Sequence, residues 1–232
     1  MNKPAASYHL GLLLGVSAAL IVVSAQSLSA GDSPPQVSKD GLQLVKQTQE
    51  RLVYLKPGAK FSQYDRMAVL DCYVEFQKNW ARDYNSQEIS SGRQVTDQDI
   101  KRMKGDLAAE FKKVFVTELT KGGYQVVNTA APDVLVLRPA LINVEVTAPD
   151  LMTAGINGTV VRSAGQGTLY LELWDSTTNT LLARVLDAKA DQQPFAQPAN
   201  RVTNTAAADD ILKSWADELV RHLDAVRGKK PT

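Results

Sequence analysis

The chain has 232 residues, of which 44% are hydrophobic and 22% are charged, so it is long enough to bury one sizeable core. Its formal net charge is +1, and removing Lys3 with the N-terminal leader leaves 25 basic residues (26 minus one) against 25 acidic residues. This balance gives no basis for a nucleic-acid surface, which needs clustered Lys and Arg, and no electrostatic attraction to anionic lipid.

The N-terminus has the order of a secretory signal peptide. A short segment with Lys3 precedes an apolar core from Leu10 to Ala25, and small and polar residues follow. The core is shorter than the about 20 residues that a membrane span needs. We therefore predict cleavage after Ala25, with cuts after Ser29 or Ala30 as alternatives, and a periplasmic protein exported by the general secretory route. An uncut leader that anchors the chain in the inner membrane is the alternative.

The composition after the leader divides the chain into three parts. Residues 26–46 are rich in Gly, Ser, Pro and Gln and are expected to form a flexible linker. Residues 47–227 carry the periodic apolar patterns of a single globular α/β domain. Residues 228–232 are expected to form a tail.

Two strands are predicted at the start of the domain, "RLVY" at 51–54 and "RMAVLDCYVEF" at 66–76. In the second strand Leu70, Cys72, Val74 and Phe76 alternate with polar residues, which predicts that they share the buried face. Cys72 is the one cysteine of the sequence, so an internal disulfide is impossible. We predict a buried structural thiol rather than one that pairs with another chain.

The polar segment 77–94 is predicted to be an irregular loop or insertion. It places Trp80 and Tyr84 around Arg82, and clusters of aromatic residues with Arg are enriched at protein contacts. These three residues are therefore candidates for a partner surface. The alternative is that Trp80 folds back onto the core.

A helix is predicted from the Thr96 cap to about Lys121, where Gly122 and Gly123 end it. Apolar residues recur along it at mostly three-to-four-residue steps, which predicts one buried stripe. The members of this stripe are Ile100, Met103, Leu107, Phe111, Val114 and Leu119.

Two strands are expected next, at 124–127 and 133–146. The second is apolar on both faces, as a central strand is. Pro139 cannot donate a ladder hydrogen bond, so we expect a bulge or a sheet edge there. The glycine-rich segment 147–167 is predicted to be a mobile loop.

The segment 168–190 predicts a β-hairpin around the turn "DSTTNT". The expected register places Glu172 opposite Arg184, which would support the pairing. Leu169, Leu171 and Leu173 would then face the core with Ala183 and Val185. The other face carries Tyr170, Trp174, Leu182 and Leu186, so it is expected to be covered by another element or to be a contact surface.

A last helix is predicted from about Ala206 to Arg227, capped by Asn204 or Thr205. The sequence thus indicates a two-layer α/β (α+β) fold. It would have a mixed, largely antiparallel sheet of about 5–6 strands, with two main helices packed on one face.

The sequence shows no constellation for a metal, a cofactor or nucleophilic catalysis. The mature chain has one histidine, His222, which reads as a residue on the flank of the last helix, and it lacks G-x-S-x-G, phosphate-loop and G-x-G-x-x-G motifs. We therefore predict no catalytic, cofactor-binding or metal-binding residue. Two carboxylate pairs are the remaining candidates for acid–base chemistry, Asp71 with Glu75 and Asp175 with Asp187.

Three functions follow as hypotheses. The first is a non-enzymatic periplasmic interaction or assembly module that contacts an unknown envelope protein or outer-membrane component. Its surface would include Trp80, Arg82, Tyr84, Tyr170 and Trp174. The second is a carboxylate-based hydrolase of an envelope polymer. The third is a carrier of a small apolar ligand, with an apolar pocket under the 147–167 loop.

The order of five segments resembles the bacterial domain-of-unknown-function 3313 family, over about residues 47–226. The segments are "YLKPGA" with Tyr64 and the 66–76 strand, "YQVVNTAAPDVLVLRPALINV", the 165–190 hairpin, and "SWADELVRHLD". The resemblance implies an exported bacterial envelope protein, usually described as a lipoprotein, and no activity or site residue. This chain departs from the pattern because Gln26, Ser27 and Ala30 stand where a lipidated cysteine would follow the leader core.

Overall fold

The computed structural model describes the following residues: 33–88, 94–147, 149, 159–161, 165–190, 197–199 and 201–228. The leader and its predicted cleavage sites lie outside them. Within the described ranges no helix has both the length and the apolar character that a membrane crossing requires.

Ten strands and three helices occur in the described part of the chain. In chain order they are β1 (Gln43–Gln47), β2 (Arg51–Leu55), β3 (Arg66–Val69), β4 (Tyr73–Phe76), α1 (Trp80–Gln87), α2 (Asp97–Lys121), β5 (Gln125–Val126), β6 (Val134–Val146), β7 (Thr159–Val161), β8 (Gly165–Asp175), β9 (Leu181–Ala190), β10 (Gln197–Ala199) and α3 (Arg201–Val226).

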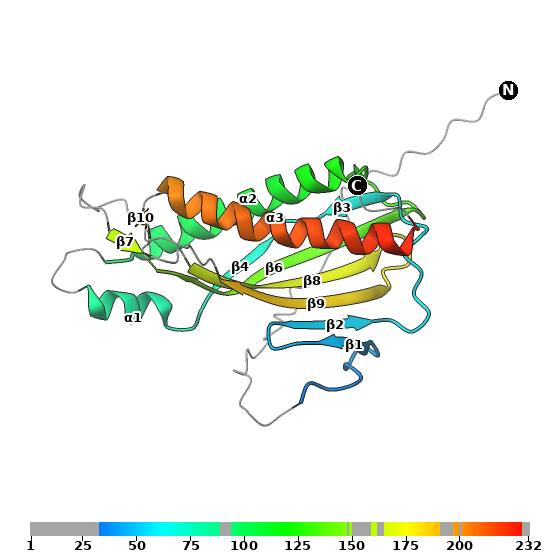
Figure 1. The fold of residues 1–232 in the computed structure, drawn as a ribbon, viewed down its shortest axis with the longest axis horizontal. Helices are drawn as coiled ribbons and strands as arrows, with labels where there is room; N and C mark the ends of the chain where they lie inside the picture. The colour runs from blue at the N-terminus through cyan, green and yellow to red at the C-terminus, as the bar shows by residue number, and fades with distance from the viewer. Residues whose placement is uncertain are drawn as a thin grey trace.

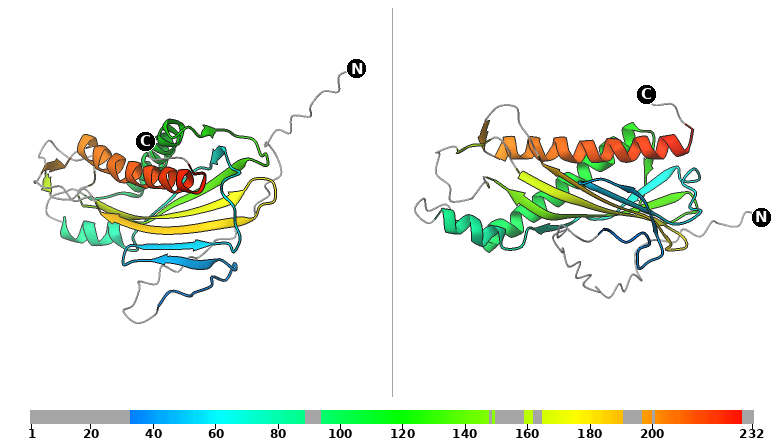
Figure 2. Two further views of the ribbon diagram at one scale, coloured as in Figure 1. Left: turned by 45° about the vertical axis from the view of Figure 1, so that its right-hand side comes forward. Right: turned by 60° about the horizontal axis from the view of Figure 1, so that its bottom comes forward.

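Eight of the strands form one mixed sheet in the order β1-β2-β9-β8-β6-β3-β5, with β4 also paired to β6. The two long helices, α2 and α3, lie next to each other across one face of this sheet (Figures 1 and 2). The predicted α+β class is confirmed. The expected number of 5–6 strands is wrong, because the 66–76 segment forms two strands and β1 adds a short edge strand before the first predicted one.

The 66–76 segment is interrupted between β3 and β4, and the interruption faces Pro139. On β6, Leu137 pairs with the end of β3 and Ala140 with the start of β4. Pro139 therefore sits in a central strand, opposite the break between β3 and β4. Because no residue of the 66–76 segment pairs with Pro139, the N–H that proline lacks is not needed on that side. From Leu137 to Ala140 the register with the 66–76 segment shifts by one residue, so the irregularity expected at Pro139 is present on this side of β6. The break also turns Leu70 outward, so its predicted burial is wrong, whereas Cys72 is buried as predicted.

The long helix α2 begins as the sequence predicts. The Thr96 side chain accepts from the Asp99 backbone N–H, and the Asp99 carboxylate accepts from the Thr96 backbone N–H, which together form a capping box. The helix ends at Gly122, and Gly123 follows with a φ of 81°. Phe111, Phe115 and Leu119 are fully buried against the sheet.

The β8–β9 hairpin has the predicted pairing of Glu172 with Arg184. A bulge near Trp174 shifts the register toward the turn. Leu169, Leu171 and Leu173 face the core as expected. The hairpin therefore presents its leucine face to the helices.

The opposite face of the hairpin is partly covered by the residues before β1. Asp40 forms an ion pair with Arg184 at 2.7 Å, and the Tyr54 hydroxyl donates to the Pro35 carbonyl at 3.1 Å. Leu42 is almost fully buried. Leu182 is buried, and Tyr170, Trp174 and Leu186 are half-buried. The structure thus places an ordered turn and β1 within the segment expected to be a linker.

Two expected loops contain regular structure. The 77–94 segment includes α1, where Trp80 stacks on Phe76 and anchors the helix. The 147–167 segment includes β7 and the start of β8, and β7 pairs with β10, which lies before α3. The last helix starts at Arg201, so the predicted cap at Asn204 or Thr205 is wrong. Residues 148, 150–158 and 162–164 lie outside the described part.

Candidate ligand-binding site

The predicted partner residues on α1 have different environments. Trp80 is buried, with its ring 4.5 Å from that of Phe76 and its indole N–H donating to the Val146 carbonyl at 3.1 Å. Tyr84 is half-buried, and Arg82 is exposed beside Asp83. Trp80 therefore stabilises the core, and Arg82 and Tyr84 are the accessible members of this group.

The other two predicted partner residues lie on β8 and bind a buried carboxylate. Tyr170 and Trp174 donate to Glu172 at 2.7 and 3.1 Å, and Arg184 donates to it at 2.8 Å. Glu172 is 3% exposed. Burial and this neighbouring carboxylate raise the pKa of the Tyr170 hydroxyl. The structure thus places the five predicted residues in two groups, one on α1 and one on β8.

The first carboxylate pair is exposed and engaged by lysines of α2. Asp71 accepts from Lys112 at 2.7 Å, and Glu75 accepts from Lys104 at 3.2 Å. Both carboxylates lie on the surface. This arrangement is typical of solvated ion pairs rather than of a catalytic cleft.

The second carboxylate pair is separated along the sheet. Asp175 accepts from Tyr64 at 2.7 Å and from the backbone N–H groups of Thr177 and Thr178, so it holds the hairpin turn. Asp187 of β9 pairs with Leu169 of β8, and Leu169 precedes Asp175 by six residues on that strand. This spacing separates the two carboxylates by about 20 Å. Hydrolysis between two flanking carboxylates requires a much shorter distance.

A cavity of about 270 Å³ lies between α3 and the strands β1, β2, β8 and β9. Its walls are mainly aliphatic and include the aromatic rings of Phe61 and Trp215. The strands contribute Val53, Leu55, Leu169, Leu171, Leu173, Ala183 and Val185, and α3 contributes Trp215, Leu219, Leu223 and Val226. The cavity thus lies beneath α3.

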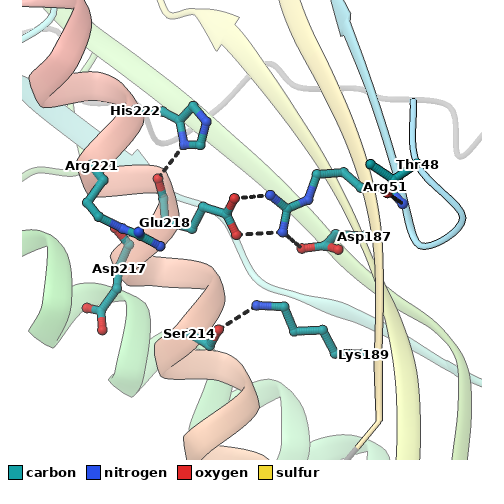
Figure 3. Close-up of polar contacts among 9 residues, drawn as sticks. All are labelled: Thr48, Arg51, Asp187, Lys189, Ser214, Asp217, Glu218, Arg221 and His222. Atoms are coloured by element: carbon teal, nitrogen blue, oxygen red, sulfur yellow. Dashed lines mark hydrogen bonds and ion pairs between the residues drawn. The ribbon is translucent and has the colours of Figure 1, made fainter. Parts of the chain in front are cut away.

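Charged side chains on the sheet and on α3 form the polar rim of this cavity (Figure 3). Arg51 of β2 donates to Asp187 of β9 at 2.6 Å and makes a two-point ion pair with Glu218 of α3. The side chains of Arg51 and Asp187 are 16% and 5% exposed. Because this pairing is largely desolvated, it fixes the position of α3 over the sheet.

His222 lies one helical turn after Glu218, at the exposed side of the rim. Its Nδ1 is 2.7 Å from the Glu218 carbonyl oxygen. Burial of the ring and the positive charges of Lys46, Arg51 and Arg221 lower the pKa of the imidazole. His222 is therefore neutral at pH 7 in a positively charged environment.

Lys189 and Trp215 meet where β9 passes beneath α3. The Lys189 ammonium donates to the Ser214 hydroxyl at 2.5 Å and lies 5.7 Å from the centre of the Trp215 ring. Burial lowers the pKa of Lys189. Figure 3 shows Lys189 reaching from the sheet to the helix beside the Arg51–Glu218 pair.

A second, smaller cavity of about 110 Å³ lies on the other side of Trp215. Leu107 of α2, Val144 of β6, Gly167 of β8 and Ile211 of α3 contribute to its walls. Trp215 lines both cavities. The indole thus stands between two apolar spaces.

This arrangement is suited to binding a small molecule with an apolar body. An apolar interior with a few placed polar groups is the usual form of a ligand pocket. Within the ranges that the structure describes, no three His, Cys, Asp or Glu side chains are grouped as a metal site would require. The polar groups present are suited to hydrogen bonding and ion pairing.

Sequence reasoning missed Arg51, Lys189 and Glu218 as site residues. It placed Trp215 on the apolar face of the last helix and His222 on the flank of that helix. One signal was available. Ser214, Glu218 and His222 follow each other at four-residue spacing along the edge of the apolar stripe of α3. Such a polar row beside an apolar face indicates the rim of a buried surface, but it does not reveal a cavity.

Structural comparison finds similar chains at low identity. A PelC dodecamer from Paraburkholderia phytofirmans is 12% identical, with 71% of this chain and 96% of that chain covered and a TM-score of 0.35. A minor lipoprotein from Acinetobacter baumannii is 11% identical over 71% of this chain and 95% of that chain, with a TM-score of 0.33. Likenesses of this degree carry no information on function.

Comparison with family models gives a definite result. No curated protein sequence was found to match the chain. The model of DUF3313, described as a protein of unknown function, matches residues 35–219, which include β1 through most of α3. The chain belongs to the DUF3313 family.

Proposed function

We propose that this protein is an exported, non-catalytic protein of the bacterial envelope that binds a small apolar ligand beneath α3. The observation that supports it is the 270 Å³ apolar cavity with its charged rim. The leader-like N-terminus supports export. Among the three functions considered from the sequence, the carrier is the one that this geometry favours.

The size of the cavity limits the ligand. A dry cavity of about 150 Å³ holds one benzene molecule, so 270 Å³ accommodates roughly ten carbon atoms. A medium-length acyl chain or a compact hydrocarbon fits this space. A large polymer or a folded peptide does not.

The alternatives have weaker support. The hydrolase requires two carboxylates in one cleft, whereas Asp71, Glu75 and Asp175 are engaged elsewhere and Asp187 is bound by Arg51. The partner surface was inferred from surplus apolar area, and the turn before β1 covers part of that area. Of the predicted partner residues on α1, we propose Arg82 and Tyr84 as the contact for a partner.

A substitution that fills the cavity tests the proposal. Val185 lies in the cavity wall, so Val185→Phe occupies space without removing a polar group. We expect decanol to bind to the purified chain in calorimetric titration, and Val185→Phe to weaken this binding at least about tenfold. Val37→Phe is the matched control, because Val37 is exposed and lies outside the cavity wall.

Two results would contradict the carrier function. In one, decanol does not bind, and the protein purified from native envelope has the mass of the chain alone, with no bound ligand. The other is equal binding by Val185→Phe and Val37→Phe. Export is tested separately by the mass of the mature N-terminus, which is expected to begin at Gln26. A membrane fraction that retains Met1 would instead support the uncut leader.

A further inference from the structure

The cavity beneath α3 opens at one edge of the sheet. β1 is the outermost strand on that side, and α2 packs against the opposite side of α3 (Figure 1). Val45 of β1 and Val226 of α3 both line the cavity, and they are 56% and 54% exposed. Because the apolar wall reaches solvent on both elements, the entrance lies between β1 and the C-terminal half of α3.

The floor of the cavity ends in a lysine at this entrance. The strand registers place Leu171, Val185 and Val53 side by side across β8, β9 and β2. Lys46 of β1 pairs with Val53, so it continues the same row on the same face of the sheet, and the whole row lines the cavity. Three inter-strand spacings separate the Leu171 and Lys46 backbones by about 14 Å. An extended acyl chain can therefore lie along this row with its head at Lys46.

The positive charge of Lys46 is not balanced by a neighbouring acid. Its ammonium has no hydrogen bond or ion pair with any residue that the structure describes. Arg51 binds both carboxylates of the cavity wall, Asp187 and Glu218, and the charge of Asp187 also acts on Lys189. These two cations and two carboxylates cancel, so Lys46 remains as the uncompensated charge of the entrance.

His222 of α3 lines the cavity across the entrance from β1. Its Nδ1 lies 2.7 Å from the Glu218 carbonyl oxygen, which can only accept, so Nδ1 carries the proton and Nε2 is left for another partner. The cations Lys46, Arg51 and Arg221 oppose a second proton on this ring. An anionic head between Lys46 and the ring would offset this repulsion and accept a hydrogen bond from the protonated imidazole.

We propose that the ligand is an amphiphile with a carboxylate head, which lies between the Lys46 ammonium and the His222 imidazole while its apolar chain extends beneath α3. This inference rests on the proposed function, because the chain of the amphiphile occupies the same cavity. A carboxylate supplies one negative charge and two acceptor oxygens, which match one ammonium and one imidazole. A cationic head is disfavoured by Lys46.

The head group is tested with two probes of equal chain length on the full mature chain. Decanoate carries the carboxylate, and decanol carries a neutral hydroxyl. Lys46→Met removes the charge and keeps an unbranched side chain on β1. In calorimetric titration it should weaken decanoate binding about threefold to fivefold, the effect of losing an exposed ion pair, and leave decanol binding unchanged. Lys213→Met is the matched control, because Lys213 is exposed on α3 outside the cavity wall and its loss removes an equal charge.

The pKa of His222 gives an independent measurement. The chain has two histidines and His9 lies in the leader, so the mature chain has one imidazole signal in nuclear magnetic resonance. Decanoate is expected to raise the pKa of this imidazole, because the carboxylate favours its charged form, and decanol is expected to leave it unchanged. By linkage, decanoate affinity should rise at least about twofold as the pH falls from about 7.5 to about 6, where the carboxylate is still ionised.

His222→Gln examines the same linkage by substitution. Glutamine cannot gain a proton, so the rise in decanoate affinity at lower pH should disappear. His222 is exposed, and circular dichroism verifies that this variant and Lys46→Met are folded.

Two outcomes would overturn the carboxylate head while leaving the carrier function intact. In the first, both probes bind to the wild type, and Lys46→Met weakens decanoate no more than Lys213→Met does. In the second, saturating decanoate leaves the pKa of His222 unchanged, which would place the head elsewhere. If neither probe binds to the wild type, the carrier function itself is wrong.

Discussion

Arg51 and Glu218 lie 167 residues apart in the chain and form a two-point ion pair between β2 and α3. The same guanidinium binds Asp187 of β9 at 2.6 Å, so one cation joins two strands and a helix at the cavity rim. This contact therefore ties α3 to the sheet at one side of the cavity.

Arg51→Met is expected to destabilise the fold strongly. Removing the guanidinium leaves the buried Asp187 and the half-buried Glu218 without their cation. Breaking a buried ion pair in this way lowers the free energy of unfolding by about 3–5 kcal/mol. Urea unfolding followed by circular dichroism measures the change.

The control for that substitution is Arg82→Met. Arg82 pairs with Asp83 on the surface and is 72% exposed, so its loss should change the unfolding free energy by less than about 1 kcal/mol. Equal effects of the two substitutions would show that the Arg51 contact does not hold α3.

Asp175 is expected to make stability sensitive to acid. Burial opposes ionisation of its carboxyl, but hydrogen bonds from Thr177, Thr178 and Tyr64 outweigh burial and hold the pKa below its usual 3.8. A carboxylate with a lowered pKa stabilises the fold above the unfolded pKa, and this contribution is lost as the pH falls through the folded pKa. The loss therefore begins near pH 4 and continues below it.

Asp175→Asn tests this dependence. We expect it to lower the free energy of unfolding by about 1–3 kcal/mol at pH 7, because hydrogen bonds to a charged acceptor are lost. The difference from the wild type should shrink as the pH falls below 4. Asp71→Asn, at a side chain that is 90% exposed, should leave the pH profile nearly unchanged. A constant difference for Asp175→Asn at all pH values would contradict the role of ionised Asp175.

Asp209 of α3 is expected to weaken the contact with α2 at neutral pH. Burial and the neighbouring Glu110 carboxyl of α2 raise the pKa of Asp209. A raised carboxyl pKa means that the folded state binds more protons, so this group costs stability as the pH rises through its folded pKa. Asp209→Asn should therefore raise the melting temperature at pH 7 and have little effect below pH 3.8. A lower melting temperature at pH 7 would contradict this reading.

Cys72 is expected to be unreactive in the native protein. Burial raises the pKa of its thiol to about 12, so the thiolate is scarce at neutral pH. A disulfide reagent at pH 8 should label the chain only after unfolding in urea. Labelling of the native protein at the rate of the unfolded protein would show that Cys72 is accessible.

Local patterns were sufficient to predict the parts of the fold that depend on neighbouring residues. The α2 cap at Thr96 and the Glu172–Arg184 register follow from capping and cross-strand pairing, and both are confirmed. Pro139 predicted an irregularity at its own position, whereas the division of the facing 66–76 segment into β3 and β4 was not predictable in the same way. It depends on which strands flank β6, and that is set by long-range topology.

The candidate site was the least predictable feature. The packing of β2, β9 and α3 brings together Arg51, Asp187 and Glu218. The spacing of these three residues in the sequence does not predict that contact. A cavity is an absence of side-chain volume between distant elements. The apolar stripe of α3 predicts a buried helix face, whereas the unfilled space at Val185 and Leu223 depends on the three-dimensional packing.

The position of a bound chain tests the central claim most directly. Uniformly ¹³C-labelled decanoate added to the protein should give intermolecular nuclear Overhauser effects to the methyl groups of Leu171, Val185 and Leu223 in the cavity. Contacts instead with Leu186 on the opposite face of the hairpin, or bound decanoate without contacts to the three cavity residues, would contradict a ligand site beneath α3.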